Sequence, residues 1–157
     1  MKFKKIAFAV LALGLSTATL AQSVGKPEDQ IRWRQSGYQF MNWNMQRIKA
    51  NIDGTFNKDQ VTQAANTLAA IANSGMGALY GPGTDKGSGW HETNVKPDLF
   101  QAEKKARLGE VASAFNKEAN ELAKVAATGD AAAIKAQFGK LGSACKACHD
   151  DFRKEIK

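Results

Sequence analysis

Apolar residues recur every three or four positions along most of the chain, which is the spacing of one face of an amphipathic helix. This pattern runs through residues 27–53, 57–75, 97–128 and 131–156. No stretch alternates apolar and polar residues in the manner of a β-strand. The sequence therefore predicts an all-α protein, in which four amphipathic helices form an antiparallel four-helix bundle.

Residues that favour helix ends bracket these segments. Pro27, followed by two acidic residues, suits the start of the first helix, and the third helix is expected to begin near Pro97. Gly129 suits the end of the third helix, and Asp130 can cap the fourth. Residues 75–96 are rich in glycine and break the helical spacing. We expect one long loop there and short connections elsewhere.

The N-terminal residues have a different composition from the rest of the chain. Three lysines within the first five residues precede an apolar stretch, residues 6–15, and small residues that end at Ala21. This order is typical of a secretory signal peptide, and the apolar stretch is too short to span a membrane. We interpret residues 1–21 as a signal peptide and residues 22–157 as one exported bundle domain, with no membrane insertion after cleavage.

The formal charge of +7 does not indicate a nucleic-acid-binding protein. Lysine and arginine are interleaved with aspartate and glutamate, and no run contains five or more like charges. The chain also lacks a recognisable nucleic-acid motif. The pattern favours a solvated surface with no nucleic-acid partner.

The segment from Cys145 to His149 reads C-x-x-C-H, the attachment signature of c-type haem. On a helix these positions share one face, so both thiols can bond to the vinyl groups while the imidazole reaches the iron. Cys145 and Cys148 also lie on the apolar face of the fourth segment. We predict one haem c per chain, covalently attached through both cysteines and enclosed by the bundle, with His149 as the axial iron ligand.

Other uses of two cysteines are less well supported. A disulfide or a redox C-x-x-C pair needs no adjacent histidine, and the thioredoxin type follows a β-strand. A structural zinc site needs four ligands, and the chain has only two cysteines and two histidines. Cys148 and His149 are also crowded side by side in the sequence. Thiol or disulfide chemistry remains the alternative to haem attachment.

Four stretches of the sequence together resemble the cytochrome c′ family, the class II c-type cytochromes. They are RQSGYQFM (34–41), YGPGT (80–84), VKPDLF (95–100) and CKACHDDFRK (145–154). The resemblance covers almost the whole chain after the signal peptide. It implies a periplasmic haem protein with five-coordinate, high-spin iron that is open to small neutral gases such as NO and CO. Many relatives have a tryptophan shortly before GPGT, where this chain has Met76 and Gly77.

The resemblance also implies roles for individual residues. On the proximal side, His149 is the axial ligand and Arg153 lies beside its imidazole, where a positive charge discourages imidazolate character.

On the distal side, the resemblance places Arg34 and Gln35 near the haem propionates, where a guanidinium can pair with a carboxylate. It places Tyr38 over the iron as a bulky residue that covers the metal without binding it. It places Glu92 and Thr93 near the haem edge.

Two residues are candidates for the sixth iron ligand, and either of them would close the open coordination position. Met41 lies one helical turn from Tyr38, and low-spin class II relatives use a methionine from the first helix as the sixth ligand. His91 lies in the glycine-rich loop. The alternative function is therefore a low-spin electron-transfer cytochrome with Met41 as the sixth ligand.

The expected function is gas binding, electron transfer with respiratory redox partners, or both. The sequence shows no acid–base pair suited to act over the haem, so we do not expect an enzyme.

Trp33, Phe40 and Trp43 form a second apolar surface on the first helix. Unless neighbouring helices cover them, such aromatic residues indicate a homodimer packed through the first two helices, as is common in the family. Displacement of Tyr38 by a gas would then be linked to dimerisation, because both events involve the same helix.

Overall fold

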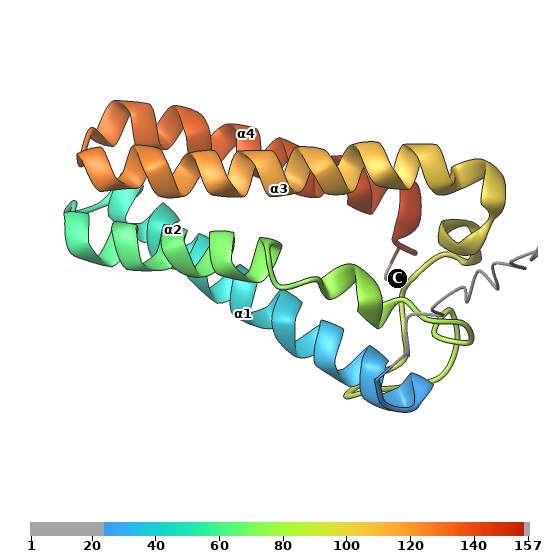
Figure 1. The fold of residues 1–157 in the computed structure, drawn as a ribbon. Helices are drawn as coiled ribbons and strands as arrows, with labels where there is room; N and C mark the ends of the chain where they lie inside the picture. The colour runs from blue at the N-terminus through green and yellow to red at the C-terminus, as the bar shows by residue number, and fades with distance from the viewer. Residues whose placement is uncertain (1–23, 156–157) are drawn as a thin grey trace, which may run out of the picture.

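The computed structural model describes residues 24–155, so the predicted signal peptide lies outside the described residues. Four long helices follow one another with alternating direction (Figure 1). They are α1 (Pro27–Asp53), α2 (Lys58–Ala72), α3 (Lys105–Thr128) and α4 (Ala131–Phe152). The predicted all-α, antiparallel four-helix bundle is therefore confirmed. None of the helices in residues 24–155 has the length and apolar content that a membrane crossing requires.

The residues expected to set helix ends do so at most positions. Pro27 occupies the first turn of α1, and Gly129 ends α3 in the left-handed conformation with φ of 81°. The Asp130 carboxylate accepts hydrogen bonds of 2.9 and 3.0 Å from the backbone N–H groups of Ala132 and Ala133. These contacts satisfy donors that the first turn of α4 would otherwise leave unpaired.

The start of the third helix differs from the expectation. Residues Pro97–Phe100 and Ala102–Lys104 form two short 3₁₀ turns, η2 and η3, and α3 begins only at Lys105. Gln101, between the turns, is extended, with φ of −76° and ψ of 139°. Proline and acidic residues favour the first turn of either kind of helix, so they did not distinguish a 3₁₀ turn from the start of α3.

Two clusters of apolar side chains form the core. The main cluster lies between the four helices, and its fully buried members include Ile48, Leu68, Leu122 and Leu141. A second, smaller cluster joins the long loop to the end of α4. Its buried residues are Val95, Leu99, Val111 and Phe152.

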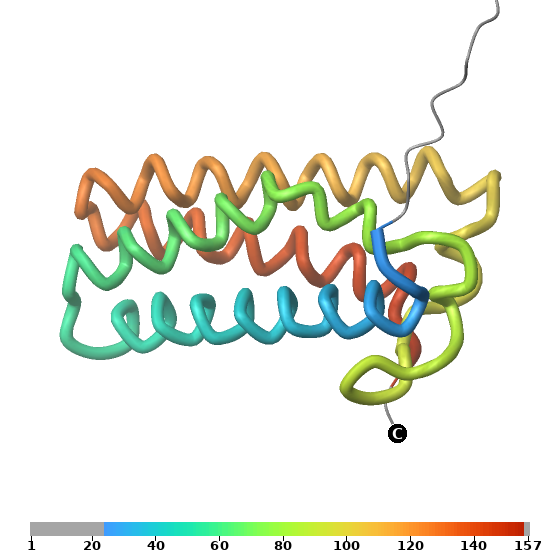
Figure 2. Tube along the Cα trace, turned by 60° about the horizontal axis from the view of Figure 1, so that its bottom comes forward, coloured from blue at the N-terminus to red at the C-terminus, as the bar shows by residue number. Residues whose placement is uncertain are grey.

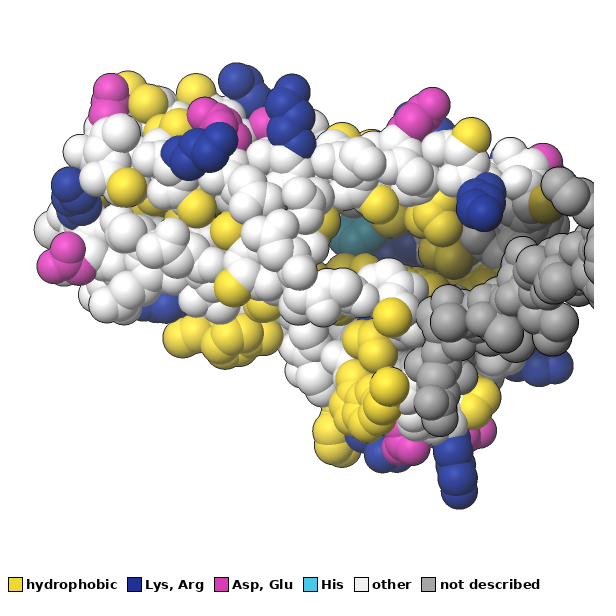
Figure 3. Space-filling view, viewed as in Figure 1, with side chains coloured by type: hydrophobic (Ala, Val, Ile, Leu, Met, Phe, Trp, Pro, Cys, Tyr) yellow, Lys and Arg dark blue, Asp and Glu magenta, His cyan; other side chains and the backbone are white. Residues whose placement is uncertain are grey.

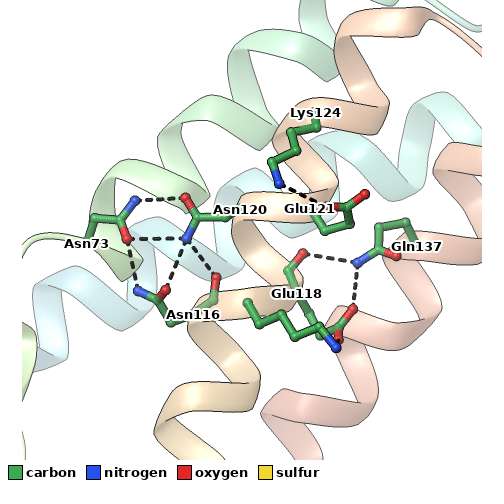
Figure 4. Close-up of polar contacts among 8 residues, drawn as sticks. Asn73, Asn116, Glu118, Asn120, Glu121, Lys124 and Gln137 are labelled. Carbon is green, nitrogen blue, oxygen red and sulfur yellow. Dashed lines mark hydrogen bonds and ion pairs between the residues drawn. The ribbon is translucent and has the colours of Figure 1, made fainter.

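Side-chain amides add polar links between helices (Figure 4). At the end of α2, Asn73 bonds to Asn116 and Asn120 of α3, with distances of 2.9 to 3.2 Å. Further along the bundle, the buried Gln137 of α4 donates to the Glu118 carboxylate of α3 over 2.7 Å. These bonds fix the alignment of α3 with the helices on both sides of it.

The alternating directions bring distant parts of the chain to one end of the bundle. The start of α1, the loop that follows α2 and the end of α4 all meet there (Figures 1 and 2). At this end α1 leans away from the α3–α4 pair (Figure 1). The predicted haem-attachment motif on α4 therefore shares an end of the molecule with Arg34 and Tyr38 on α1.

Candidate haem site

Cys145, Cys148 and His149 lie in the last two turns of α4, in the arrangement that a helix imposes on C-x-x-C-H. Both thiols are free and half-buried. Cys145 packs against the main core cluster, and Cys148 packs against the second cluster. The two anchors therefore sit where the clusters meet, on the inner side of the helix.

The protonation states of the motif suit haem attachment. Burial raises the pKa of Cys145 and of Cys148, so both thiols stay protonated at neutral pH. Burial also lowers the pKa of His149, and the charge of Arg153 lowers it further. The imidazole is therefore held neutral, the form that can donate a lone pair to a metal.

Two tyrosine hydroxyls meet at this end of the bundle. The hydroxyls of Tyr38, on α1, and Tyr80, at the end of a 3₁₀ turn (η1, Met76–Leu79), lie 2.6 Å apart. Burial is the main cause that raises the pKa of both, and the charge of a Cys148 thiolate would raise both further. Tyr80 and Cys148 both pack against the second core cluster, so the tyrosine pair and this thiol lie at the same end of the bundle.

The surface of the molecule is hollowed at the same end of the bundle. Figure 3 shows an opening between the α3–α4 pair and the lower half of the molecule, with hydrophobic side chains around it and a histidine side chain inside. Tyr38 is 43% exposed even though its hydroxyl bonds to that of Tyr80. An opening lined by hydrophobic groups, with thiols and an imidazole on one helix, fits a covalently bound haem.

Arg34 is buried beside this opening and organises the loop. Its side chain is 2% exposed, and its guanidinium lies over the Tyr80 ring, 4.6 Å from the centroid. It donates to the carbonyl oxygens of Leu79 and Thr84, at 3.1 and 2.5 Å, and to the Thr93 hydroxyl at 2.7 Å. Burial lowers the pKa of Arg34, but an arginine remains charged at neutral pH.

Gln35, the next residue, holds another part of the loop. Its amide donates to the carbonyl oxygen of His91 at 2.9 Å and lies 3.2 Å from the His91 Nδ1 atom. Its oxygen accepts a 2.8 Å bond from the Trp90 backbone N–H. These contacts hold His91, one of the candidate sixth ligands, against the start of α1.

The end of the loop is tied to the chain that follows His149. Val95 and Arg153 form an antiparallel bridge, in which the Lys154 N–H donates to the Asn94 carbonyl oxygen at 2.7 Å. The loop thus joins α1, through Arg34 and Gln35, to the end of α4. Arg153 itself is exposed in a groove beside His149.

The structure brings together only some of the residues expected near the haem. Tyr38 bonds to Tyr80, which packs against the same cluster as Cys148, whereas Arg34 and Thr93 bond to each other. Glu92 is exposed, and its side chain makes no hydrogen bond or ion pair with the other expected residues among the described contacts.

The role of Tyr80 at this site could not be predicted from the sequence. The YGPGT stretch was recognised, but nothing in the sequence showed that its tyrosine hydroxyl would reach α1.

Comparisons with known proteins identify the family. The family model described as Cytochrome C′ matches residues 29–153. Cytochrome c′ of Rhodocyclus tenuis is 68% identical over 131 residues, which cover 83% of this chain and 97% of that protein.

Solved structures agree as well. One, of a cytochrome c′ with ligand-controlled dimer dissociation, is 55% identical, with a TM-score of 0.80 over 83% of this chain and 98% of its own. Another, a nitric oxide complex of a variant from Alcaligenes xylosoxidans, is 28% identical, with a TM-score of 0.73 over 84% and 98%.

The family carries haem c attached through two cysteines, and the two cysteines of this chain are Cys145 and Cys148. The motif, the bundle and the matched residues all agree, and the chain belongs to the cytochrome c′ family.

Proposed function

We propose that this chain is a periplasmic haem protein that binds the small neutral gases NO and CO at five-coordinate iron. Haem iron supplies the position at which such a gas binds, and the surrounding protein decides which ligands reach it. The observation that carries the proposal is the placement of Tyr38. Tyr38, on α1, bonds to Tyr80, and Tyr80 packs against the same core cluster as Cys148.

The tyrosine hydroxyls are neutral hydrogen-bonding groups at the proposed site. Burial raises the pKa of Tyr38 and Tyr80, so both remain protonated at neutral pH. Each can form hydrogen bonds there, but neither can serve as a general base. Neutral groups of this kind suit a neutral gas as the ligand.

The environments of the competing ligands support the same proposal. Met41 is 7% exposed and belongs to the main core cluster, where a methionine acts as apolar filling. His91 is held by Gln35 on the loop. The nitric oxide complex of the Alcaligenes xylosoxidans variant supports NO as a ligand for this family member too.

Absorption spectra of the ferric and ferrous haem-loaded protein, with and without CO, test the proposal. We expect a high-spin spectrum that changes on addition of CO to the ferrous protein. A low-spin spectrum that CO leaves unchanged would overturn the proposal and favour Met41 as the sixth ligand.

Electron transfer is the second candidate function. The exposed groove beside His149 contains Lys96, Arg153 and Lys154, together with two acidic residues. This surface offers a redox partner access near the axial ligand. Stopped-flow reduction by respiratory donor proteins would detect it, and rates no faster than those with a small inorganic reductant would count against it.

We also propose a homodimer that packs through α1 and α2. Trp33, Phe40 and Trp43 are 44%, 49% and 51% exposed, so neighbouring helices of the same bundle do not cover them. The relative with ligand-controlled dimer dissociation supports a second copy as the partner. Tyr38 and Trp43 lie on one helix, so movement of Tyr38 on gas binding would be linked to dimer affinity.

A further inference from the structure

Tyr80 contacts Tyr38 although the two residues lie in different segments of the chain. Its hydroxyl lies 2.6 Å from that of Tyr38, which is at the short end of the range for hydrogen bonds between hydroxyls. The two residues are 42 positions apart, and they are the only tyrosines in the chain. The contact therefore joins two separately placed segments.

Tyr80 is held in place by the loop and by Arg34. The Arg34 guanidinium lies over its ring and bonds to the neighbouring Leu79 carbonyl oxygen. On the other side of Tyr80, the Gly81 N–H donates to the Gln30 side chain of α1 at 3.1 Å. The ring itself packs against the second core cluster. Tyr80 therefore presents its hydroxyl from a position that α1 fixes on both sides.

We propose that Tyr80 is a positioning residue that latches Tyr38 through this hydrogen bond and so lowers the affinity for gas. The inference rests on the proposed gas-binding function. A gas that approaches on the Tyr38 side requires Tyr38 to move, and the bond to Tyr80 opposes that movement. Breaking the bond costs free energy that is subtracted from the free energy of gas binding.

The CO affinity of the ferrous protein tests the latch. Y80F keeps the ring and its contact with Arg34 but removes the hydroxyl. We expect it to bind CO about threefold to tenfold more tightly than wild type, the usual effect of one net hydrogen bond. An unchanged or weaker CO affinity would overturn the latch.

A double-mutant cycle separates the latch from a general structural effect. If Tyr80 acts through Tyr38, Y80F changes CO affinity in the wild-type background and leaves it unchanged in the Y38F background. An equal gain in both backgrounds would show that Tyr80 acts independently of Tyr38, and would overturn the proposal.

Ultraviolet resonance Raman spectroscopy of the ferric protein gives a readout that needs no gas. Because the chain has only two tyrosines, its tyrosine bands report this pair alone. We expect Y80F to shift the Tyr38 bands toward those of a tyrosine without this partner. If the wild-type protein binds no CO, the proposed gas-binding function fails. Independently of that result, the latch is overturned if the Tyr38 Raman bands have the same positions in Y80F as in wild type.

Discussion

Arg34 and Thr93 are 59 positions apart in the chain and are joined by a 2.7 Å hydrogen bond from guanidinium to hydroxyl. Both are almost completely buried, at 2% and 4% exposure. The same guanidinium bonds to the carbonyl oxygens of Leu79 and Thr84. A single buried charge on α1 thus holds three separate points of the long loop.

Replacement of Arg34 by glutamine should destabilise the haem-loaded protein. Two buried acceptors and one partly buried acceptor would lose a charged donor, which we expect to lower the free energy of unfolding by about 2 to 4 kcal/mol. The midpoint of urea unfolding measures the change. Lys124→Gln is the control, because it removes an exposed ion pair with Glu121 and should cost less than about 0.5 kcal/mol. Equal shifts for the two variants would contradict the role given to Arg34.

The contacts of the long loop could not be predicted from the sequence, whereas the helices could. Local signals were enough to place most helix ends, since Pro27, Gly129 and Asp130 act on their own turns. The spacing of Cys145, Cys148 and His149 likewise indicated a shared helical face and haem c. The contact of Arg34 with Thr93 could not be predicted in this way, because loop conformation decides which distant residues meet. The placement of Arg34 near the haem propionates and of Thr93 near the haem edge stays a prediction.

Gly89 should tolerate no side chain, because the loop lies directly on α1 there. A Cβ atom at this position would lie 2.6 Å from the Arg32 backbone nitrogen and 2.6 Å from the Gln35 side-chain oxygen. We expect Gly89→Ala to cost about 1 to 3 kcal/mol and to speed hydrogen exchange at the Trp90 amide, which bonds to Gln35. Gly77→Ala is the matched control, since its Cβ would meet nothing within 4 Å.

If Gly89→Ala leaves both the unfolding midpoint and the exchange at Trp90 at their wild-type values, the loop does not rest on α1 as described. If hydrogen exchange at the Trp90 amide is also faster in the Gly77→Ala control, the effect is a general one of added side chains on loop mobility.

The tyrosine pair should make stability fall at alkaline pH. Burial raises the pKa of Tyr38 and Tyr80 above the value of about 10 that tyrosine has in an unfolded chain. Above pH 10 the unfolded chain therefore binds fewer protons than the folded one, so stability is full below this pH and falls as pH rises beyond it. We expect thermal unfolding midpoints to fall more steeply above pH 10 in wild type than in the Y38F/Y80F double variant. Parallel curves would contradict the raised pKa values.

Met41→Leu should leave the absorption spectrum of the haem unchanged. Met41 packs in the main core cluster, and leucine has a similar volume, so we expect a stability change below about 1.5 kcal/mol. A change from a low-spin to a high-spin spectrum in this variant would identify Met41 as an iron ligand in the wild-type protein.

Trp43→Glu should weaken the proposed dimer. Trp43 is 51% exposed on α1, stacks against Phe40 at 5.3 Å between ring centroids, and lies under the Arg47 guanidinium. Exposed aromatic residues of this kind commonly supply the main binding energy of an interface, and a buried carboxylate would oppose association. We expect the dimer dissociation constant, measured by sedimentation equilibrium, to rise by at least about tenfold.

Lys140→Glu, at an exposed position on α4, lowers the charge by two units, against one for Trp43→Glu, but does so away from this surface and should leave the dissociation constant unchanged. CO should raise the dissociation constant of wild type and of Lys140→Glu alike if movement of Tyr38 is transmitted along α1 to Trp43. If the dimer dissociation constant is the same with and without CO, gas binding and dimerisation are not linked. A Trp43→Glu protein that associates as tightly as wild type would instead place the dimer interface on another face of the bundle.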